Sequence, residues 1–294
     1  MSILGIDLGG TNVRAGVVRQ NRLGRVLKSP VPAAGSVDDV MDVIYGLADR
    51  LAAEKTEGIG VGVPSVVDPK TGVVYDVQNI PSWKKVPLKA LLEKRYKVPA
   101  HVNNDANCFA AGERYFGKAR HCDHAVGLTI GTGLGAGIIA NGRLYSGAVC
   151  GAGEFGMLPY KDRNFEFYAS GQYFKNVHRA SGKLLFEKAR SGDADARRAF
   201  SEFGTHLGEA IKAILYALDP EIIILGGSIS RAHAFFKAAM WKAVRGFAYT
   251  PTVERIRIEV SGVKNIAVLG AAALFLDAAE RTGTVKPSGA RLKK

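Results

Sequence analysis

The chain reads IDLGGTNVRAGVV over residues 6–18, and the same pattern returns as LTIGTGLGAGII over residues 128–139. Each copy is an apolar strand, a turn of Gly and Thr, and a second apolar strand. Glycine permits a turn with positive φ and lets a ligand approach the peptide N–H groups, which together form an anion-binding nest. Two such hairpins predict a duplicated domain that holds a phosphate between its halves, and hence an enzyme that uses a nucleotide.

Length and composition fit an ordinary globular protein. The 294 residues are enough for two domains with cores of their own. Hydrophobic residues make up 47% of the chain, but no apolar run reaches the length of a membrane span. The N-terminus leads directly into a strand rather than into a secretory segment. We therefore expect a cytoplasmic protein without a membrane partner.

Charge and cysteine content exclude several other classes of function. The net charge of +13 favours anionic ligands, but the basic residues are scattered and no nucleic-acid-reading module is present. We expect no specific nucleic-acid partner. The three cysteines are far apart and form no Cys-x-x-Cys pair, so we expect buried free thiols rather than a disulfide or zinc ribbon; they are Cys108, Cys122 and Cys150.

Hydrophobic periodicity predicts the same α/β order twice. The first half has predicted strands at 3–7, 12–19, 25–29, 58–63 and 100–103, and helices after a Ser36 capping box and at 88–96 and 105–116. The second has strands at 124–130, 221–225 and 255–260, and helices at 166–189 with breaks, 194–218, 232–245 and 266–281. We expect a small domain at 1–117, joined by the helix 267–282, a larger domain at 118–266, and a basic tail at 283–294.

Two carboxylates are the main catalytic candidates. Asp7 ends the first strand beside the Gly9-Gly10-Thr11 turn, where it either holds Mg²⁺ through water or caps the turn. Asp105 lies in the segment NNDAN, residues 103–107, at a predicted strand-to-helix junction. There it either caps the helix or acts as a base, because the helix dipole favours its ionised form.

Three further segments carry candidate ligands. Glu154 stands in a glycine-dense loop, and Glu166 opens a predicted helix at Phe165 to Phe174; either can accept hydrogen bonds from ligand hydroxyls. Gly226 and Gly227 follow a buried strand, where open α/β sheets bind ligands, so an adenine or ribose can lie against them. Taken alone, each carboxylate is better explained as a surface residue, and the glycine pair as an ordinary strand-to-helix turn.

The complete set resembles the ROK family of sugar kinases, within the superfamily of duplicated ATPases that includes actin and hexokinase. The resemblance covers nearly the whole chain. It rests on two phosphate motifs, an adenosine motif, a catalytic segment and three sugar-binding segments, which read DLGGT at 7–11, IGTGLGAG at 130–137, LGGS at 225–228, NDAN at 104–107, NIPSW at 79–83, GEFG at 153–156 and EFYASG at 166–171.

The resemblance implies an α/β fold of two duplicated actin-like (ribonuclease H-like) ATPase domains with the active site in a cleft between them. It implies Asp105 as the catalytic base. It assigns the sugar to Asn79, Asn104, Asp105, Glu154 and Glu166, and ATP and its phosphates to Asp7, Gly9, Gly10, Thr11, Gly131, Thr132, Gly133, Gly226 and Gly227.

The implied activity is ATP- and Mg²⁺-dependent phosphorylation of a hexose on its 6-hydroxyl. Glucose is the first expectation, and an N-acylhexosamine, fructose or allose is the alternative. A noncatalytic sugar-sensing regulator is the second hypothesis, although regulators of the family have a DNA-binding module in front and here the first strand begins at Ser2 or Ile3. The family also implies a homodimer. The sequence leaves the donor open between ATP and polyphosphate.

The chain departs from the family pattern where the family binds zinc. A His that contacts both sugar and zinc usually follows Glu-x-Gly, and Met157 stands there instead. The family's cysteine-rich zinc loop is replaced by Leu158 to Phe165, which contains no Cys. We therefore predict no zinc site, and a sugar pocket altered on the side that usually faces C1 and C2. Pro64-Ser65 in place of Pro-Gly is a milder departure.

Overall fold

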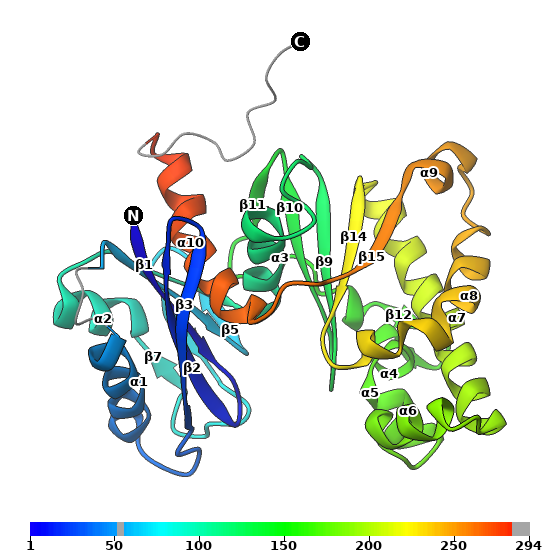
Figure 1. Ribbon diagram of the computed structural model, residues 1–294, viewed down its shortest axis with the longest axis horizontal. Helices are drawn as coiled ribbons and strands as arrows, with labels where there is room; N and C mark the ends of the chain where they lie inside the picture. Colours follow the sequence, from blue (N-terminus) through cyan, green and yellow to red (C-terminus); the bar gives the residue numbers. More distant parts are fainter. Residues whose placement is uncertain (52–55, 284–294) are drawn as a thin grey trace. The chain divides into compact units, whose positions relative to one another are not determined.

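The computed structural model describes residues 1–51 and 56–283 and divides the chain into two compact units (Figure 1). Among the described residues, the first unit contains 1–51, 56–121, Gly137–Ala152 and 262–283, and the second contains Cys122–Ala136 and Gly153–Ser261. The predicted basic tail lies outside the described residues from position 284 onward. No helix in the described part of the chain is long and apolar enough to cross a membrane.

Each of the two large sheets has five strands, and both sheets use the same order. The first runs β3-β2-β1-β4-β8 and the second β11-β10-β9-β14-β15, so that the third, second, first, fourth and fifth strand stand side by side in each. In both sheets the first, fourth and fifth strands are parallel. The predicted duplication of an α/β domain is confirmed by this shared topology.

The described residues of the first unit form the first large sheet, a small three-stranded sheet, strand β11 of the second large sheet and four helices. In chain order these are β1 Ser2–Leu8, β2 Asn12–Arg19, β3 Arg22–Pro30, α1 Val37–Leu51, β4 Gly58–Val63, β5 Val66–Asp68, β6 Val73–Tyr75, β7 Lys85–Val86, α2 Leu88–Tyr96, β8 Ala100–Asn104, α3 Asp105–Phe116, β11 Arg143–Tyr145 and α10 Ile266–Arg281. Strand β10, Leu134–Ala140, contributes residues to both units.

The second unit is mostly helical outside its sheet. Its elements are β9 Ala125–Ile130, the 3-10 helix η1 Phe155–Met157, β12 Pro159–Tyr160, β13 Arg163–Asn164, α4 Phe165–Ala169, α5 Gly171–Val177, α6 Gly182–Arg190, α7 Ala194–Leu218, β14 Ile222–Gly226, the 3-10 helix η2 Ile229–Ala232, α8 His233–Val244, α9 Thr250–Arg255 and β15 Arg257–Val260. Its core packs α7 and α8 against strands β9 and β14, around Phe174, Phe200 and Phe203.

Helix α10 returns to the first unit and packs directly on its sheet. A Cβ atom at Gly60 in β4 would lie 1.8 Å from the Ala271 carbonyl oxygen of α10, so only glycine lets the helix approach this closely. A Cβ at Gly5 in β1 would meet the Val268 carbonyl in the same way, at 2.2 Å. The last helix of the chain is therefore part of the N-terminal core.

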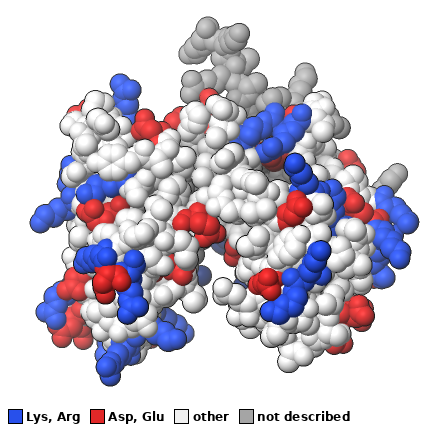
Figure 2. Space-filling view, turned by 180° about the vertical axis from the view of Figure 1, so that it is seen from behind, with Lys and Arg blue, Asp and Glu red and all other residues white. Residues whose placement is uncertain are grey.

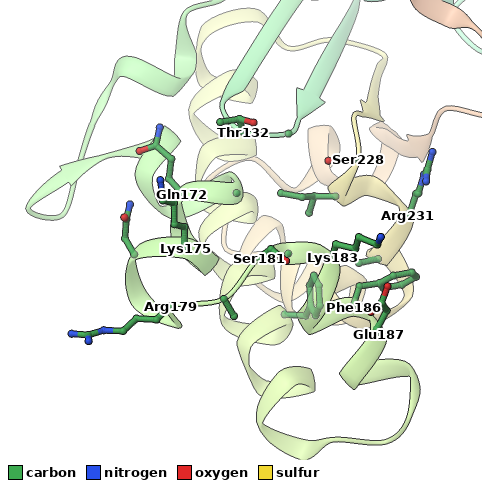
Figure 3. Close-up of a pocket in the computed structure, with 18 of the residues that line it drawn as sticks. Thr132, Gln172, Lys175, Arg179, Ser181, Lys183, Phe186, Glu187, Ser228 and Arg231 are labelled. Atoms are coloured by element: carbon green, nitrogen blue, oxygen red, sulfur yellow. The ribbon is translucent and has the colours of Figure 1, made fainter. Parts of the chain in front are cut away.

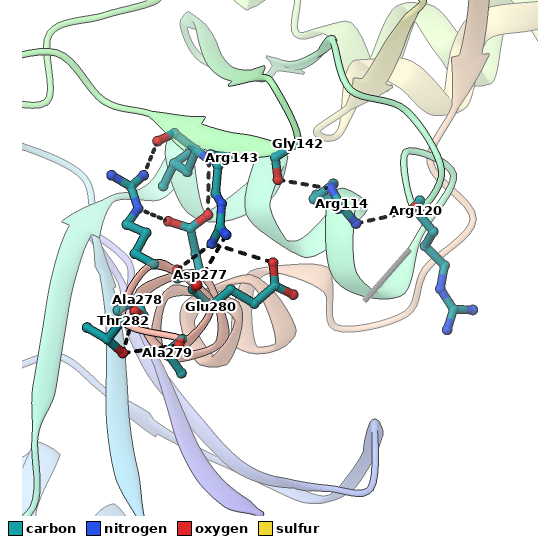
Figure 4. A network of polar contacts seen from close by, with 11 residues as sticks. Arg114, Arg120, Gly142, Arg143, Asp277, Ala278, Ala279, Glu280 and Thr282 are labelled. Atoms are coloured by element: carbon teal, nitrogen blue, oxygen red, sulfur yellow. Dashed lines mark hydrogen bonds and ion pairs between the residues drawn. The ribbon is translucent and has the colours of Figure 1, made fainter. Parts of the chain in front are cut away.

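A polar network fixes the C-terminal end of α10 to β11 (Figure 4). The buried Asp277 carboxylate accepts from the Leu144 backbone N–H at 3.1 Å and from Arg281 Nε at 2.8 Å. Arg143 donates to the Glu280 carbonyl and forms an ion pair with its carboxylate at 3.5 Å. Buried carboxylates need such partners, because an unpaired charge in the interior is strongly destabilising.

Most predicted elements are confirmed, including the Ser36 capping box, in which Ser36 and Asp39 exchange hydrogen bonds at the start of α1. The three cysteines are free and buried, as expected. The prediction of one helix from Phe165 to Phe174 is wrong. Ser170 has an extended backbone there, with φ of −135°, and its side chain caps a new helix by accepting from the Gln172 N–H.

Figure 2 shows one face of the molecule, on which Lys and Arg side chains alternate with Asp and Glu. Many of the charges are paired, for example Arg95 with Asp49 at 2.6 Å and Arg198 with Asp195 at 2.8 Å. The positive net charge of the chain is therefore not collected into a single patch on this face.

Candidate functional site

In the first unit, three neighbouring parallel strands end at the same edge of the sheet and bring the candidate carboxylates together. Asp7 in β1 is in register with Gly62 in β4, and Gly62 is in register with Asn103 in β8. Asp105 follows two residues later as the first residue of α3. Burial raises the pKa of Asp7 to about 6, with Arg14 opposing and Asp105 adding to the shift. The two carboxylates are thus in electrostatic contact.

Asn104, not Asp105, caps helix α3. The Asn104 side chain accepts from the Ala106 N–H at 2.8 Å, and its amide group donates to the Ser65 carbonyl at 3.3 Å. The side chain of Asp105 is exposed and its Oδ1 lies 2.9 Å from the Ala106 nitrogen. The capping interpretation therefore belongs to Asn104, and the Asp105 carboxylate faces solvent at the N-terminus of a helix, where the ionised form is favoured.

The first glycine hairpin lies against the Asn79 side chain. Gly9, Gly10 and Thr11 connect β1 to β2, with the Gly9 N–H donating to the Asn12 carbonyl at 3.0 Å. A Cβ at Gly10 would lie 2.6 Å from Nδ2 of Asn79. The absence of a side chain at Gly10 thus makes room for the amide of Asn79, and a predicted phosphate residue and a predicted sugar residue are neighbours.

Two apolar anchors hold the loop that carries Asn79. Ile80 and Trp83 are fully buried, and the backbone N–H of Trp83 donates to the Ile80 carbonyl at 2.9 Å. The Ile80 N–H in turn donates to the Val77 carbonyl at 3.0 Å. Asn79 itself remains exposed. The loop is therefore built as a rigid support that presents one amide side chain.

The second hairpin, between β9 and β10, repeats this arrangement with a carboxylate. A Cβ at Gly133 would lie 2.5 Å from Oε2 of Glu166. That oxygen accepts from the Leu134 N–H at 3.0 Å, and Oε1 accepts from Gln172 Nε2 at 2.7 Å. Glu166 is half-buried. The structure thus brings a predicted phosphate hairpin and a predicted sugar-binding carboxylate together in the second unit as well.

Residues at the start of α5 donate hydrogen bonds to the same hairpin. The Gly171 N–H donates to the Gly131 carbonyl at 2.7 Å, and the Ser170 hydroxyl donates to the Thr132 carbonyl at 3.1 Å. These bonds engage the carbonyl groups of the turn. The side chain of Thr132 remains exposed, and a Cβ at Gly131 would have no atom within 4 Å. The turn is therefore fixed on one side and open on the other.

The hairpin glycines do not use the positive φ that glycine permits. The described glycines with positive φ are Gly72, Gly142, Gly147, Gly153, Gly192, Gly227 and Gly283, which include none of the hairpin positions. Sequence alone could not distinguish a glycine required by φ from one required by space. At Gly10 and Gly133 the requirement is space, because Asn79 and Glu166 occupy the volume of a side chain.

Glu154 and Met157 share one short 3-10 turn. Glu154 immediately precedes η1, and the Met157 N–H donates to the Glu154 carbonyl at 3.0 Å. Burial and then the nearby Glu166 carboxylate raise the pKa of Glu154. Glu154 comes directly before η1 and Met157 is its last residue, so both side chains come from the same short turn. Met157 is 51% exposed.

A large cavity of about 1170 Å³ lies within the second unit (Figure 3). Gly131 and Thr132 from the second hairpin line it, together with Ser228 and Ile229, which follow β14. Helices α5 and α6 supply most of the remaining wall. A glycine turn that opens into a large cavity is the geometry expected where a protein binds an extended phosphoryl donor.

Gly226 and Gly227 are not among the residues that line the cavity. Gly226 ends β14 in register with Thr129, and Gly227 has φ of +82°. A Cβ at Gly227 would lie 2.3 Å from the Ile130 carbonyl oxygen. The lack of a side chain at Gly227 therefore allows the turn after β14 to pass close to the backbone of Ile130 at the end of β9. Ser228, the residue after this pair, is the one that lines the cavity.

Sequence reasoning missed most of the cavity wall. Lys183, Phe186, Glu187 and Arg190 all line it from helix α6. Their spacing of three and four residues marks one helical face, opposite the buried Leu185 and Ala189. The helix was predicted, but a polar helical face is usually solvated, so nothing in the sequence separated this face from an ordinary surface.

The residues present fit a nucleotide better than they fit a resident metal cluster. In the part of the chain that the structure describes, no three His, Cys, Asp or Glu side chains gather as metal ligands. Asp7 is a single carboxylate with a pKa raised by burial, which a nearby cation would relieve. One carboxylate acting through water suits Mg²⁺ that arrives bound to substrate phosphates.

Comparison with known proteins supports the same interpretation. The chain matches the model of the ROK family over residues 3–278. A glucokinase from Thermotoga maritima is 29% identical over 94% of this chain and 97% of its own length, and a β-glucoside kinase from Listeria monocytogenes is 31% identical over 96% and 99%. A solved ROK family glucokinase from Streptomyces griseus, in complex with glucose and AMPPNP, is 27% identical with a TM-score of 0.78, covering 93% of this chain and 99% of that one.

The match to the family model and the two full-length relatives agree with the motifs quoted from the sequence. The resemblance predicted from those motifs is confirmed, and so is the fold of two actin-like ATPase domains, which the solved glucokinase shares. The chain belongs to the ROK family.

Proposed function

We propose that the protein is an ATP-dependent sugar kinase that phosphorylates a hexose, with glucose as the first candidate, on its 6-hydroxyl. The observation that carries this proposal is the repeated pairing of a phosphate hairpin with a sugar-type ligand, Gly10 with Asn79 and Gly133 with Glu166. A kinase needs donor and acceptor held at adjoining positions. Relatives that are named glucokinase and β-glucoside kinase support a phosphoryl transfer to sugar.

Asp105 is the catalytic base in this proposal. Its carboxylate accepts the proton of the sugar hydroxyl while that oxygen bonds to the γ-phosphorus of ATP, and the bond from the γ-phosphorus to the bridging oxygen breaks to release ADP. The support from this chain is the exposed position of Asp105 as the first residue of α3, where Asn104 is the N-cap. Asn79, Asn104, Glu154 and Glu166 orient the sugar.

The phosphates of ATP are bound by the two hairpins, at Gly9, Gly10 and Thr11 and at Gly131, Thr132 and Gly133. Mg²⁺ held through water at Asp7 supplies charge neutralisation on the phosphate oxygens when it is bound. The adenosine part lies in the cavity next to Ser228, the residue that follows Gly226 and Gly227. We also propose that the protein is a cytoplasmic homodimer. Its domains have the limits expected from the sequence, 1–117 and 118–266.

The test measures ADP release from MgATP against a panel of hexoses and N-acylhexosamines. Sugar-dependent turnover that falls at least about a hundredfold in Asp105→Ala, with sugar binding retained, supports the proposal. Turnover in Asp105→Ala equal to that of the unmodified protein would remove Asp105 from the mechanism. The sugar with the highest kcat/KM identifies the substrate among glucose, an N-acylhexosamine, fructose and allose.

A sugar-sensing regulator is the second candidate, and the observation that favours it is Met157. The exposed thioether cannot replace an imidazole as a ligand of sugar hydroxyls. Sugar binding measured by calorimetry without turnover on any sugar of the panel would favour the regulator. Turnover on any one of them would exclude a purely noncatalytic role.

A further inference from the structure

The side chain of Asn103 forms three hydrogen bonds at the end of β8, two residues before Asp105. It is only 6% exposed. Its Oδ1 accepts from the Asn104 backbone N–H at 2.8 Å and from Asn107 Nδ2 at 2.9 Å. Its Nδ2 donates to Ser146 Oγ at 3.0 Å. One buried amide thus connects the end of a strand, the first turn of α3 and the segment that follows β11.

The first turn of a helix depends on such partners, because its backbone N–H groups have no acceptor within the helix. In α3 the Ala106 N–H is bound by the Asn104 side chain, and the Asn104 N–H is bound by Asn103. The bond from Asn107 reaches Asn103 from the third residue of the helix. Asn103 therefore holds the chain on both sides of Asp105.

Asn107 carries a buried oxygen that its surroundings do not satisfy. The side chain is 1% exposed, and its Oδ1 has no hydrogen-bond partner among the described residues. Burial of a polar atom without a partner is unfavourable, so packing alone does not account for an amide at this position. The bond that the Asn107 side chain does form is the one to Asn103.

Residues 146–152, here called the Ser146 loop, are fixed against the same strand end. The Ala152 N–H donates to the Ser146 carbonyl at 3.2 Å and closes the loop. Within the loop the buried Cys150 has a φ of +58°, which persists in a residue other than glycine only where surrounding contacts hold it. Burial raises the pKa of the Cys150 thiol to about 11, and a hydrogen bond with the Asn104 backbone N–H opposes this shift. The loop thus contacts residues 103 and 104 at two points.

We propose that Asn103 is a positioning residue for phosphoryl transfer, which holds Asp105 in place through its bonds to Asn104 and Asn107 and is itself held by the Ser146 loop. The inference rests on the proposed kinase activity. Because the Asp105 side chain is exposed, the position of its carboxylate follows the position of the helix start. A base takes the sugar proton only from hydrogen-bond distance, and a displacement of about 1 Å can lower the rate roughly a hundredfold.

The variant Ser146→Ala tests the proposal without replacing the buried amide. It removes the acceptor of Asn103 Nδ2 from a half-buried loop position, so the protein should fold. We expect kcat for sugar phosphorylation to fall at least about tenfold, and by a larger factor than the sugar Kd rises, with KM for MgATP unchanged. Calorimetry with the sugar gives Kd and the number of binding sites, so that kcat is expressed per folded protein. Ser146→Thr keeps the hydroxyl and should restore most of kcat.

Tyr145→Phe is the matched control, because it removes a hydroxyl from the neighbouring residue. The exposed Tyr145 hydroxyl forms no hydrogen bond with the residues that the structure describes. This variant should leave kcat and Kd unchanged. Asn103→Ala should lower kcat at least as far as Ser146→Ala, and the double variant should lower it no further, since the two side chains act through one bond.

The outcomes separate this inference from the proposed function. Turnover in Ser146→Ala equal to that of the unmodified protein would overturn the inference and leave the kinase assignment intact. The inference would also be overturned by equal losses in Ser146→Ala and Ser146→Thr, or by single losses that multiply in the double variant. No turnover by the unmodified protein on any sugar would overturn both the inference and the proposed function.

Discussion

Glu166 Oε2 lies where a side chain on Gly133 would have to be, since a Cβ there would fall 2.5 Å from that oxygen. The same oxygen accepts from the Leu134 N–H, one residue beyond Gly133. A carboxylate that we propose binds the sugar therefore packs against the hairpin that we propose binds the phosphates, and it accepts a hydrogen bond from the backbone of that hairpin. Binding of one substrate is expected to be sensitive to small changes in the site of the other.

Replacing Gly133 by alanine tests this relationship. Gly133→Ala should displace the Glu166 carboxylate and lose its bond to Leu134, which costs about 1–3 kcal/mol of stability and raises KM for the sugar at least tenfold. Gly131→Ala is the matched control, because a Cβ there has no atom within 4 Å. It should leave stability and sugar affinity unchanged and raise KM for ATP.

Urea denaturation and sugar titration of both variants provide the measurements. If Gly133→Ala bound sugar as tightly as the unmodified protein, Glu166 would not be a sugar ligand. If Gly131→Ala weakened sugar binding as much as Gly133→Ala, the effect would belong to the hairpin as a whole and not to the contact with Glu166.

The two carboxylates proposed to bind the sugar, Glu154 and Glu166, should be visible in the pH dependence of sugar binding. Burial and the nearby Glu166 carboxylate raise the pKa of Glu154, so a larger fraction of Glu154 is protonated at mildly acidic pH than for an ordinary glutamate. Because only the ionised carboxylate accepts from two hydroxyl groups, sugar affinity should fall as the pH falls through that raised pKa.

Glu166→Gln removes one negative charge and lowers the pKa of Glu154, so this acidic limb should move to lower pH. The amide oxygen of the substituted side chain can still accept from Gln172, which preserves the local structure. Isothermal titration calorimetry with the sugar between pH 4 and 8 measures the limb. If the fall in sugar affinity at acidic pH were unchanged in Glu166→Gln and also persisted in Glu154→Gln, the titration would belong to another group.

Much of the architecture follows from the sequence because long amphipathic segments have strong signals. The bounds predicted for α3, α7 and α10 agree with the structure, at Asp105–Phe116, Ala194–Leu218 and Ile266–Arg281. Helix α9 was missed because its six residues include none that is buried. Strands β5, β6 and β7 are two or three residues long and are defined by pairing with one another rather than by periodicity.

The candidate site was predicted as a set of residues but not as a geometry. The motifs located Asp7, Asn79 and Asp105 in the first unit, and the register of parallel strands explains why Asp7 and Asp105 meet. The neighbours of the hairpin glycines were not predicted, since the volumes that Gly10 and Gly133 leave empty are filled by Asn79 and Glu166, far away in sequence. Such contacts between distant segments have no local sequence signal.

Asn104 and Asp105 are adjacent, yet replacing Asn104 should mainly lower stability, whereas replacing Asp105 should mainly lower kcat. Asn104→Ala removes the cap of α3 and should cost about 1 kcal/mol of stability. Asp105→Asn keeps a polar side chain at the first position of the helix and should change stability by less than about 0.5 kcal/mol while lowering kcat at least a hundredfold. Chemical denaturation and steady-state kinetics separate the two. A destabilised Asp105→Asn with normal kcat would reverse the two assignments.

The absence of a zinc site is a prediction that metal analysis can check. The three cysteines are buried and Met157 occupies the place of the family's His, so no cluster of thiolate and imidazole ligands is available among the described residues. Turnover should be unaffected by a zinc-selective chelator, and the purified protein should contain far less than one zinc per chain. Loss of activity on chelation, restored by zinc, would contradict the prediction.

Met157 should determine how the enzyme ranks substituted sugars. Its side chain is exposed on the same turn as Glu154, so it presents an apolar surface near a carboxylate that we propose binds the sugar. Met157→His replaces that surface with a hydrogen-bond donor, which is worth about 0.5–1.5 kcal/mol with a hydroxyl partner. The ratio of kcat/KM for glucose to kcat/KM for a β-glucoside with an apolar aglycone should therefore rise about three- to tenfold.

Leu158→His is the control for this change, because Leu158 is also exposed but follows the 3-10 helix that Met157 ends. It should leave the ratio unchanged. An equal shift in both variants would mean that general polarity at the surface, and not the position of Met157, decides selectivity. A shift in Met157→His alone would show that the residue that replaced the family's histidine selects the substrate by favouring apolar substituents over hydroxyl groups.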